Sequence, residues 1–370
     1  YQEGKFAVGS ILCAVIPKDE KKLSAKYLHT YLNMFKDSLL VPLMKGAANV
    51  SLPMSKLADI RIELPKIEKQ IEIIELVDEV SASVNKNDNL LANQLNEIVK
   101  LRQQILQDAI QGKLVPQDPN DEPASILLEK IKAEKDKLIK ENKLKKGNPL
   151  PQIKEQEILF EIPDNWIWCR LGNIASVVRG GSPRPAGDKK YYDGDIPFLK
   201  VADLTSDEKI YLDNHTYTIK KEGLNKTRYV DADTLMLTNS GATLGIPKIC
   251  SFPTTFNDGI AAFLGLNNIN KVFLYYFLKS KSDWFLKVAS RGQGQPNLNT
   301  DIISQTIIAL PPLKEQHRIV KKINELLKVC DELEKEVKQN QNLTQQLLQS
   351  ALKEALEPKD KYVNNEFTKK

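Results

Sequence analysis

The stretch Leu310-Pro311-Pro312-Leu313 repeats an earlier stretch of the same chain, Leu64-Pro65-Lys66-Ile67, at an offset of 246 residues. The same offset superimposes Gln70 on Gln316, and upstream it superimposes Tyr27 on Phe273. One register that holds over about fifty residues indicates a tandem duplication rather than chance. The second copy, from about residue 146 onward, contains a whole globular part followed by a long helix, and the first copy begins partway through its globular part.

A seven-residue apolar period follows each repeated stretch. In the first copy it comprises Val84, Leu91, Ile98 and Ile105, and in the second Ile323, Cys330, Val337, Thr344 and Ala351. Pro65 suits a helix start and Gly112 a helix end. The period predicts a helix of about 46 residues in the first copy, about 69 Å long at 1.5 Å per residue, and a matching helix in the second.

A single long helix cannot shield such an apolar stripe from water, so each stripe needs a partner. We favour pairing of the two helices as an antiparallel coiled coil, which would give the chain a pseudo-twofold internal repeat. In the alternative, each stripe packs on its own globular part or on another protein.

Short β-like runs separated by turns occupy residues 160–310, and a helix is expected near residues 272–289. The fold class is therefore α+β, with globular domains of mixed strands and helices joined by two long helices. The predicted segments are a partial first domain (1–64), the first long helix (65–112), a linker with a short charged helix (113–150), a second domain (151–310), the second long helix (311–357) and a tail (358–370).

Composition excludes several classes of protein. The 370 residues include 41% hydrophobic and 27% charged residues, and no run approaches the ~20 apolar residues of a membrane helix. The four cysteines lie far apart without a CxxC pair, which argues against zinc and favours thiols in a reducing cytoplasm. The net charge is +5, but residues 160–310 carry 17 Lys and Arg against 15 Asp and Glu. Any DNA affinity there must come from a local patch.

Catalytic motifs are absent from the sequence. There is no GxxxxGK[ST] phosphate loop, no HExxH and no GxSxG. The three histidines, His29, His215 and His317, form no recognisable acid–base cluster. We therefore do not expect an enzyme.

Several stretches, taken in order, resemble the specificity (S) subunit of type I restriction-modification systems. Residues 162–174, with Trp166 and Leu171-Gly172, resemble the start of that family's target recognition domain, and Gly180-Gly181-Ser182-Pro183 resembles the turn that follows it. The series continues with residues 196–204, 241–245, 295–298 and 310–316. The first copy lacks the Trp-to-Leu-Gly opening and the glycine-rich turns, so the resemblance leads us to expect another Trp-x-x-x-x-Leu-Gly opening upstream.

The resemblance implies two target recognition domains, each recognising one half of a split site on double-stranded DNA, held by two long helices. It implies docking of methyltransferase (M) and restriction (R) subunits, which would carry the S-adenosylmethionine, ATP and magnesium chemistry, and no cofactor or metal in this chain. Two other functions remain open: a coiled-coil scaffold protein that binds no DNA, and the specificity fragment of a fused restriction-methylation enzyme.

Three polar loops supply candidate DNA-binding residues: a first loop (179–190), a second loop (238–243) and a third loop (290–297). Bases and phosphates are recognised by directional donors, acceptors and cations. Arg291, Gln293 and Gln295 are the first candidates. The full set of candidates is Arg179, Ser182, Arg184, Lys189, Lys190, Tyr191, Asn239, Ser240, Thr243, Arg291, Gln293, Gln295 and Asn297, with Lys45 and Asn49 in the partial first domain. The alternative is that the glycines only make turns and the polar side chains only solvate loops.

Overall fold

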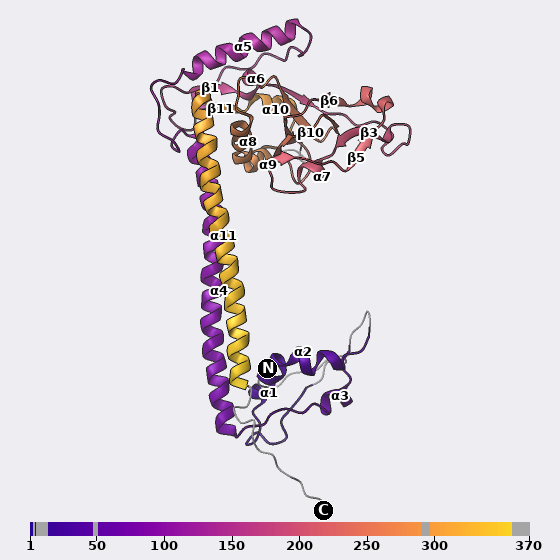
Figure 1. Cartoon of the computed structure of the whole chain (residues 1–370), viewed down its shortest axis with the longest axis vertical. Coiled ribbons are helices and arrows are strands. Elements are labelled where there is room, and N and C mark those ends of the chain that lie inside the picture. The colour runs from indigo at the N-terminus through magenta and orange to yellow at the C-terminus, as the bar shows by residue number, and fades with distance from the viewer. Residues whose placement is uncertain (3, 5–13, 47–50, 290–296, 357–370) are drawn as a thin grey trace, which may run out of the picture. The chain divides into compact units, whose positions relative to one another are not determined.

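The computed structural model describes residues 1–2, 4, 14–46, 51–289 and 297–356. The chain divides into two compact units (Figure 1). Unit 1 comprises Tyr1–Ile98 and Glu332–Lys370, and unit 2 comprises Val99–Asp331. Each of the two long helices contributes one part to each unit.

Unit 1 contains short helices packed at one end of the long helices. Its elements are α1 (Ala25–Met34), α2 (Lys36–Leu39), η1 (Val41–Leu43) and α3 (Met54–Ala58), with parts of α4 (Ile67–Ile110) and α11 (Leu313–Leu356). Its core joins Tyr27 and Tyr31 of α1 to Ile73 and Val77 of α4 and Leu356 of α11. The short helices are therefore held on the long ones by a small apolar cluster.

The helices α4 and α11 pair side by side and antiparallel (Figure 1). In unit 1, Val77 clusters with Leu356, whereas farther along α4 the Asn87 amide donates to the Thr344 hydroxyl at 2.9 Å. From Val77 to Asn87 the residue numbers rise along α4, while those of their partners on α11 fall from Leu356 to Thr344. The two helices therefore run antiparallel. Many of the apolar positions predicted from the seven-residue period are buried: Leu91, Ile98, Ile105, Ile323, Cys330 and Val337. The α+β fold class with an antiparallel helix pair is confirmed.

Unit 2 is built on three sheets among its described residues. The first pairs β1 (Ile167–Arg170) with β11 (Ile307–Leu310). The second has the order β2 (Ser176–Arg179), β10 (Ile260–Leu264), β7 (Thr234–Thr238), β8 (Pro247–Cys250) and β4 (Tyr211–Leu212). The third has the order β5 (Tyr217–Ile219), β3 (Tyr192–Leu199), β9 (Thr254–Phe256) and β6 (Arg228–Val230).

Helices cover the sheets of unit 2. The remaining elements are α5 (Ala124–Lys140), η2 (Glu155–Glu157), α6 (Leu171–Ile174), α7 (Val201–Leu204), η3 (Lys221–Lys226), α8 (Lys271–Ser280), α9 (Ser282–Ala289) and α10 (Thr300–Gln305). The central strands β7 and β8 are buried along their whole length, as expected for strands covered on both faces. The apolar core gathers Leu199, Met236, Phe256 and Ile260.

The helix α5 packs onto unit 2 rather than standing free as a charged linker helix. Ala124, Leu127 and Ile131 are buried. The ammonium of Lys135 donates to the carbonyl oxygens of Gly172 and Ala175 at the end of α6, and burial lowers its pKa. A lysine here serves as a structural donor, because burial of its ammonium requires hydrogen-bond partners.

The duplication reappears in three dimensions at the starts of the long helices. The bounds of α4 and α11 differ by the same 246 residues as the sequence repeat, and so do those of α1 and α8. At each start a fully buried glutamine joins the long helix to the short one. The Gln70 carbonyl accepts from Ser24 N–H at 2.9 Å and its amide donates to Pro65 O at 2.8 Å.

Gln316 makes the equivalent contacts in unit 2. Its carbonyl accepts from Asn270 N–H at 3.0 Å and its amide donates to Pro311 O at 2.9 Å. Ser24 and Asn270 are the N-cap residues of α1 and α8. The repeat has therefore kept one anchor, in which a buried amide satisfies backbone groups that the helix starts would otherwise leave unpaired.

A second set of contacts occurs at the start of α11. The indole N–H of Trp166 donates to Glu315 at 2.9 Å, and the Gln117 amide donates to its other oxygen at 2.7 Å. Gly112, with φ +73°, ends α4, and a Cβ there would lie 2.6 Å from the Pro163 side chain. These contacts pack the residues just before β1 against both long helices in unit 2.

Among the described residues, no helix is long and apolar enough to cross a membrane. Within the same ranges, no group of three or more His, Cys, Asp or Glu side chains could hold a metal ion.

Candidate nucleic-acid interface

The turn after β2 is fixed by close backbone contacts. The N–H of Gly180 donates to Ile260 O and that of Gly181 to Phe256 O, both at 3.1 Å. A Cβ on Gly180 would lie 2.3 Å from the carbonyl oxygens of Phe256 and Asn257. Only glycine fits at that distance, so these residues determine where the following Ser182 and Arg184 emerge.

Two of the predicted DNA-binding side chains have partners within the protein. The Ser182 hydroxyl donates to the Asp258 carboxylate at 2.7 Å, and Arg179 Nε donates to the Asp258 carbonyl at 2.5 Å. The Ser182 hydrogen bond is the main cause that holds the pKa of Asp258 below its usual value. Arg179 is nevertheless exposed, as is Arg184, so their remaining guanidinium donors face solvent.

A second basic segment, which sequence reasoning did not single out, packs against this loop. The backbone N–H of Lys220 donates to Tyr191 O at 2.8 Å, and its ammonium donates to Lys189 O at 2.6 Å. Arg228 Nε donates to Arg179 O at 3.2 Å. The segment of residues 220–228 is thus joined to the predicted loop at both of its ends.

Together these segments form what we call the basic cluster, made of Arg179, Arg184, Lys189, Lys190, Lys220, Lys221, Lys226 and Arg228. Segments 179–195 and 220–228 contain these eight cations and four acidic residues. Residues 160–310 as a whole contain 17 cations and 15 acidic residues, so the rest of that region is slightly acidic. The net positive charge of this region therefore lies in these two segments, which is the condition for a local phosphate-binding patch.

Aromatic rings lie beside the basic cluster. The Lys190 ammonium is 5.4 Å from the ring centroid of Tyr191, and the Lys200 ammonium is 3.3 Å from that of Tyr217. Each contact orients a cation over a ring face. The Tyr192 hydroxyl donates to Pro183 O at 2.9 Å and ties the loop to β3.

The second predicted loop closes the β7–β8 hairpin. The Thr238 hydroxyl accepts from Ile246 N–H at 2.8 Å and donates to Thr243 O at 2.7 Å. Gly241 adopts φ +85° with open space around it. Thr243 is exposed, and Ser240 is partly exposed and bridges to the exposed Asn297. The structure thus brings the second loop together with the end of the third.

Asn239 differs from its neighbours because its side chain is fully buried. Neither its amide nitrogen nor its amide oxygen has a hydrogen-bond partner among the described residues. Its backbone accepts from Leu298 N–H at 2.7 Å and donates to Gly259 O at 2.9 Å. Asn239 therefore joins two loops through its backbone hydrogen bonds.

Other candidates lie outside the described residues, namely Arg291, Gln293, Gln295 and Asn49. In unit 1, Lys45 pairs with Ser51 through two 2.9 Å backbone hydrogen bonds. By the 246-residue offset, Ser51 corresponds to Asn297. Ser51 and Asn297 each form a bridge, although their partners, Lys45 and Ser240, are not equivalent in the repeat.

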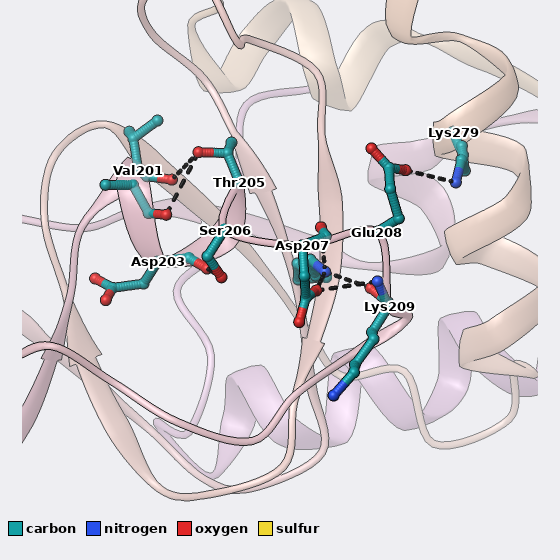
Figure 2. A network of polar contacts seen from close by, with 10 residues as sticks. Val201, Asp203, Thr205, Ser206, Asp207, Glu208, Lys209 and Lys279 are labelled. Atoms are coloured by element: carbon teal, nitrogen blue, oxygen red, sulfur yellow. Dashed lines mark hydrogen bonds and ion pairs between the residues drawn. The ribbon is translucent and has the colours of Figure 1, made fainter. Parts of the chain in front are cut away.

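A buried lysine near the second loop has a structural role. The Lys248 side chain is 1% exposed, and its ammonium donates to the Asp207 carboxylate at 2.5 Å and to the Asp207 carbonyl at 2.9 Å. It also contacts the Lys209 carbonyl. Figure 2 shows this network around Asp207 and Lys209, with Glu208 reaching Lys279. Because its donors are used inside the protein, Lys248 is not a candidate for phosphate binding.

Comparison with known proteins shows which family the chain resembles. Residues 1–97 and 163–345 match the family model described as the type I restriction modification DNA specificity domain. The chain is 34% identical over 277 residues to the type I restriction enzyme EcoAI specificity subunit of Escherichia coli, and 33% identical over 270 residues to the EcoEI specificity subunit of that species. Each match covers 69% of this chain and 44% of the relative, so the match spans less than half the length of these relatives.

Solved structures share the fold at low sequence identity. One, from work on complex assembly and conformational transition of the type I R-M system, has a TM-score of 0.62 at 16% identity and covers 91% of this chain and 72% of that chain. The HsdS subunit from Thermoanaerobacter tengcongensis has a TM-score of 0.51 at 17% identity, covering 91% and 71%. With the family model matching most of its residues, the chain belongs to the type I restriction-modification DNA specificity family.

Proposed function

We propose that this chain selects the DNA sequence on which a type I restriction-modification complex acts. The observation that carries the proposal is the basic cluster of unit 2, where two segments distant in sequence bring eight cations together beside exposed polar loops. Cations bind phosphates and position the duplex, whereas exposed amides, hydroxyls and guanidinium groups discriminate bases.

Each part of the surface has a distinct role in this proposal. Lys189, Lys190, Lys221 and Lys226 are exposed and would bind phosphates. Arg184, Ser240, Thr243 and Asn297 present directional groups that would face base edges, joined by Arg291, Gln293 and Gln295. Ser182 and Asn239 would hold the loops in place, and Lys45 and Asn49 would act in the corresponding loop of unit 1.

The proposal includes partners that supply the chemistry. Methyltransferase and restriction subunits would dock on the chain and carry S-adenosylmethionine, ATP and magnesium, and the chain itself would contribute no catalytic residue or cofactor. It would act in the cytoplasm, on one half of a split DNA site per recognition domain.

Charge reversal in the basic cluster tests this function. The double variant Lys221→Glu/Lys226→Glu should weaken binding to duplex DNA on all sequences alike, and should make the logarithm of the binding constant depend less steeply on salt concentration. The matched control is Lys132→Glu/Lys137→Glu, which changes two exposed lysines of α5 by the same net charge. Binding is measured by competition titration with the methyltransferase subunit present. Equal losses in both variants would mean that only overall charge matters, and the cluster would not be the interface.

A further inference from the structure

The turn between β9 and β10, residues 257–259, holds the first candidate loop in place. The Asp258 carboxylate accepts from the Ser182 hydroxyl at 2.7 Å, and the Asp258 carbonyl accepts from Arg179 Nε at 2.5 Å. These two partners lie on either side of Gly180-Gly181 in the sequence. A single residue of the turn is therefore bonded to both ends of the tight bend that begins the first loop.

The same turn contacts the second loop, and through it the end of the third. The Asn239 N–H donates to Gly259 O at 2.9 Å. A Cβ on Gly259 would lie 2.8 Å from Ser240 Oγ, so the turn and the second loop are in close contact. The Asn239 carbonyl in turn accepts from Leu298 N–H at 2.7 Å. The turn thus connects the three segments that contain the unit 2 candidates.

Asp258 places a negative charge among the cations of the basic cluster. The hydrogen bond from Ser182 is the main cause that lowers the pKa of the Asp258 carboxyl, and the charges of Arg179 and Arg184 lower it further, against the opposing effect of burial. The carboxyl is therefore ionised at neutral pH. Its charge acts on the two arginines of the first loop rather than on the lysines that follow them.

An ionised carboxylate at this position affects two kinds of DNA contact in opposite ways. It repels phosphates, so it weakens binding that ignores sequence. It also holds the first loop and favours a fixed orientation of the nearby guanidinium groups, which directional contacts with bases require. Because specificity is a difference between two affinities, a group that weakens sequence-independent binding and supports base contacts increases specificity.

We propose that Asp258 is a specificity-determining residue, which positions the first loop against the second and keeps Arg184 from binding phosphates. It acts through Arg184 and touches no base itself, so it is a positioning residue. The inference rests on the proposed function and adds to it the residue that separates sequence recognition from binding to any duplex. Loss of the carboxylate charge therefore strengthens binding to unrelated DNA while it weakens discrimination.

The test replaces the carboxylate by an amide of the same shape. Asp258→Asn keeps an oxygen that can accept from the Ser182 hydroxyl, and it removes one negative charge. The matched control is Asp213→Asn. Asp213 is exposed, accepts from the Ser251 hydroxyl at 2.8 Å, and follows β4, which lies at the opposite edge of its sheet from β2. Both variants thus remove one charge from the same kind of hydrogen bond.

Binding is measured by competition titration of the whole chain with its methyltransferase subunit on two duplexes. One is a duplex that the wild-type chain enriches from a randomised library, and the other is a scrambled duplex of equal length and composition. Asp258→Asn should bind the scrambled duplex more tightly, with a salt dependence steeper by about 0.9 for one additional phosphate contact. It should lose about tenfold in discrimination, the size of one directional base contact. Asp213→Asn should leave the discrimination unchanged.

A further variant identifies the residue through which Asp258 acts. Arg184→Ala should reduce discrimination in the wild-type chain, and adding Asp258→Asn to it should cause no further loss, because the two residues act as one unit. Additive losses would contradict this route.

The remaining outcomes separate this inference from the proposed function. Unchanged discrimination in Asp258→Asn, or the same loss in Asp213→Asn, would overturn the role of Asp258 and leave the proposed function in place. Weaker binding to both duplexes together with a lower melting temperature would make Asp258 a purely structural residue, which also overturns the inference. Failure of the wild-type chain to enrich any sequence would contradict the proposed function itself, and this inference with it.

Discussion

The starts of α4 and α11 are two copies of one design that differ in what surrounds them. Both contain a fully buried glutamine that bonds to the preceding proline carbonyl and to the N-cap amide of a short helix. Among the residues that the structure describes, only the start of α11 adds a tryptophan–glutamate contact, while α4 has an exposed lysine–glutamate pair there. The duplicated helices thus share an anchor and differ in the groups that face a neighbouring segment.

That difference separates two kinds of constraint. The glutamine satisfies backbone groups that every copy of the helix start contains, so any replacement leaves buried polar atoms unpaired. Glu315 contacts Trp166 and Gln117, which lie outside the helix, whereas Lys69 pairs with Glu72 of its own helix. The anchor is common to both copies, and the charged position differs with its surroundings.

The largest expected effect concerns Trp166, which contacts the start of α11. Trp166→Ala should destabilise unit 2 by about 3–5 kcal/mol, because it removes a buried indole and leaves Glu315 with one donor fewer. Leu64→Ala in unit 1 should cost less than about 1 kcal/mol, since that side chain is largely exposed. Urea unfolding of unit 2 can be followed through Trp168 and Trp284. Similar losses for both variants would show that the two helix starts are equally enclosed.

Replacing the buried glutamine should lower the stability of each unit by a similar amount. Gln70→Ala and Gln316→Ala should each destabilise their own unit by about 2–3 kcal/mol, because each leaves a buried amide and a buried carbonyl unpaired. Hydrogen exchange along α1 and α8 reports each unit separately. A loss confined to one unit would contradict the view that the glutamine is a shared structural requirement.

The smallest effect is a pH dependence found at one helix start. Burial raises the pKa of Glu315, in spite of the opposing hydrogen bonds from Trp166 and Gln117. The folded state therefore holds a proton more tightly than the unfolded state, so stability from this group is greatest below pH 4.5 and falls as pH rises through the raised pKa. Glu315→Gln should flatten that part of the stability profile. A slope that persists in Glu315→Gln would assign the effect to another group.

The sequence predicts the elements whose signal lies within one helix or strand, or recurs in the repeat. The seven-residue period predicted a helix over about residues 66–111, and α4 spans Ile67–Ile110. The short β-like runs expected within residues 160–310 correspond to strands such as β7 and β10. These predictions succeed because periodicity and turn residues act within one element.

Contacts between distant residues were not predictable in the same way. The junction of residues 220–228 with the 179–191 loop depends on backbone hydrogen bonds across β3 and β5, and the Trp166–Glu315 contact joins positions 149 residues apart. Lys135 and Lys248 were unexpected inside the protein, since composition alone places lysine in solvent. The DNA-binding residues remain a prediction.

In the proposed function, unit 2 recognises a DNA sequence through its loops. The most direct measurement selects duplexes from a randomised library with the chain and its methyltransferase subunit, before and after residues 179–191, 238–243 and 290–297 are exchanged for those of a relative. The wild-type chain should enrich one fixed half-site sequence, and the exchanged chain should enrich a different one. Enrichment of the same sequence by both chains, or no enrichment beyond salt-sensitive binding to any duplex, would contradict it.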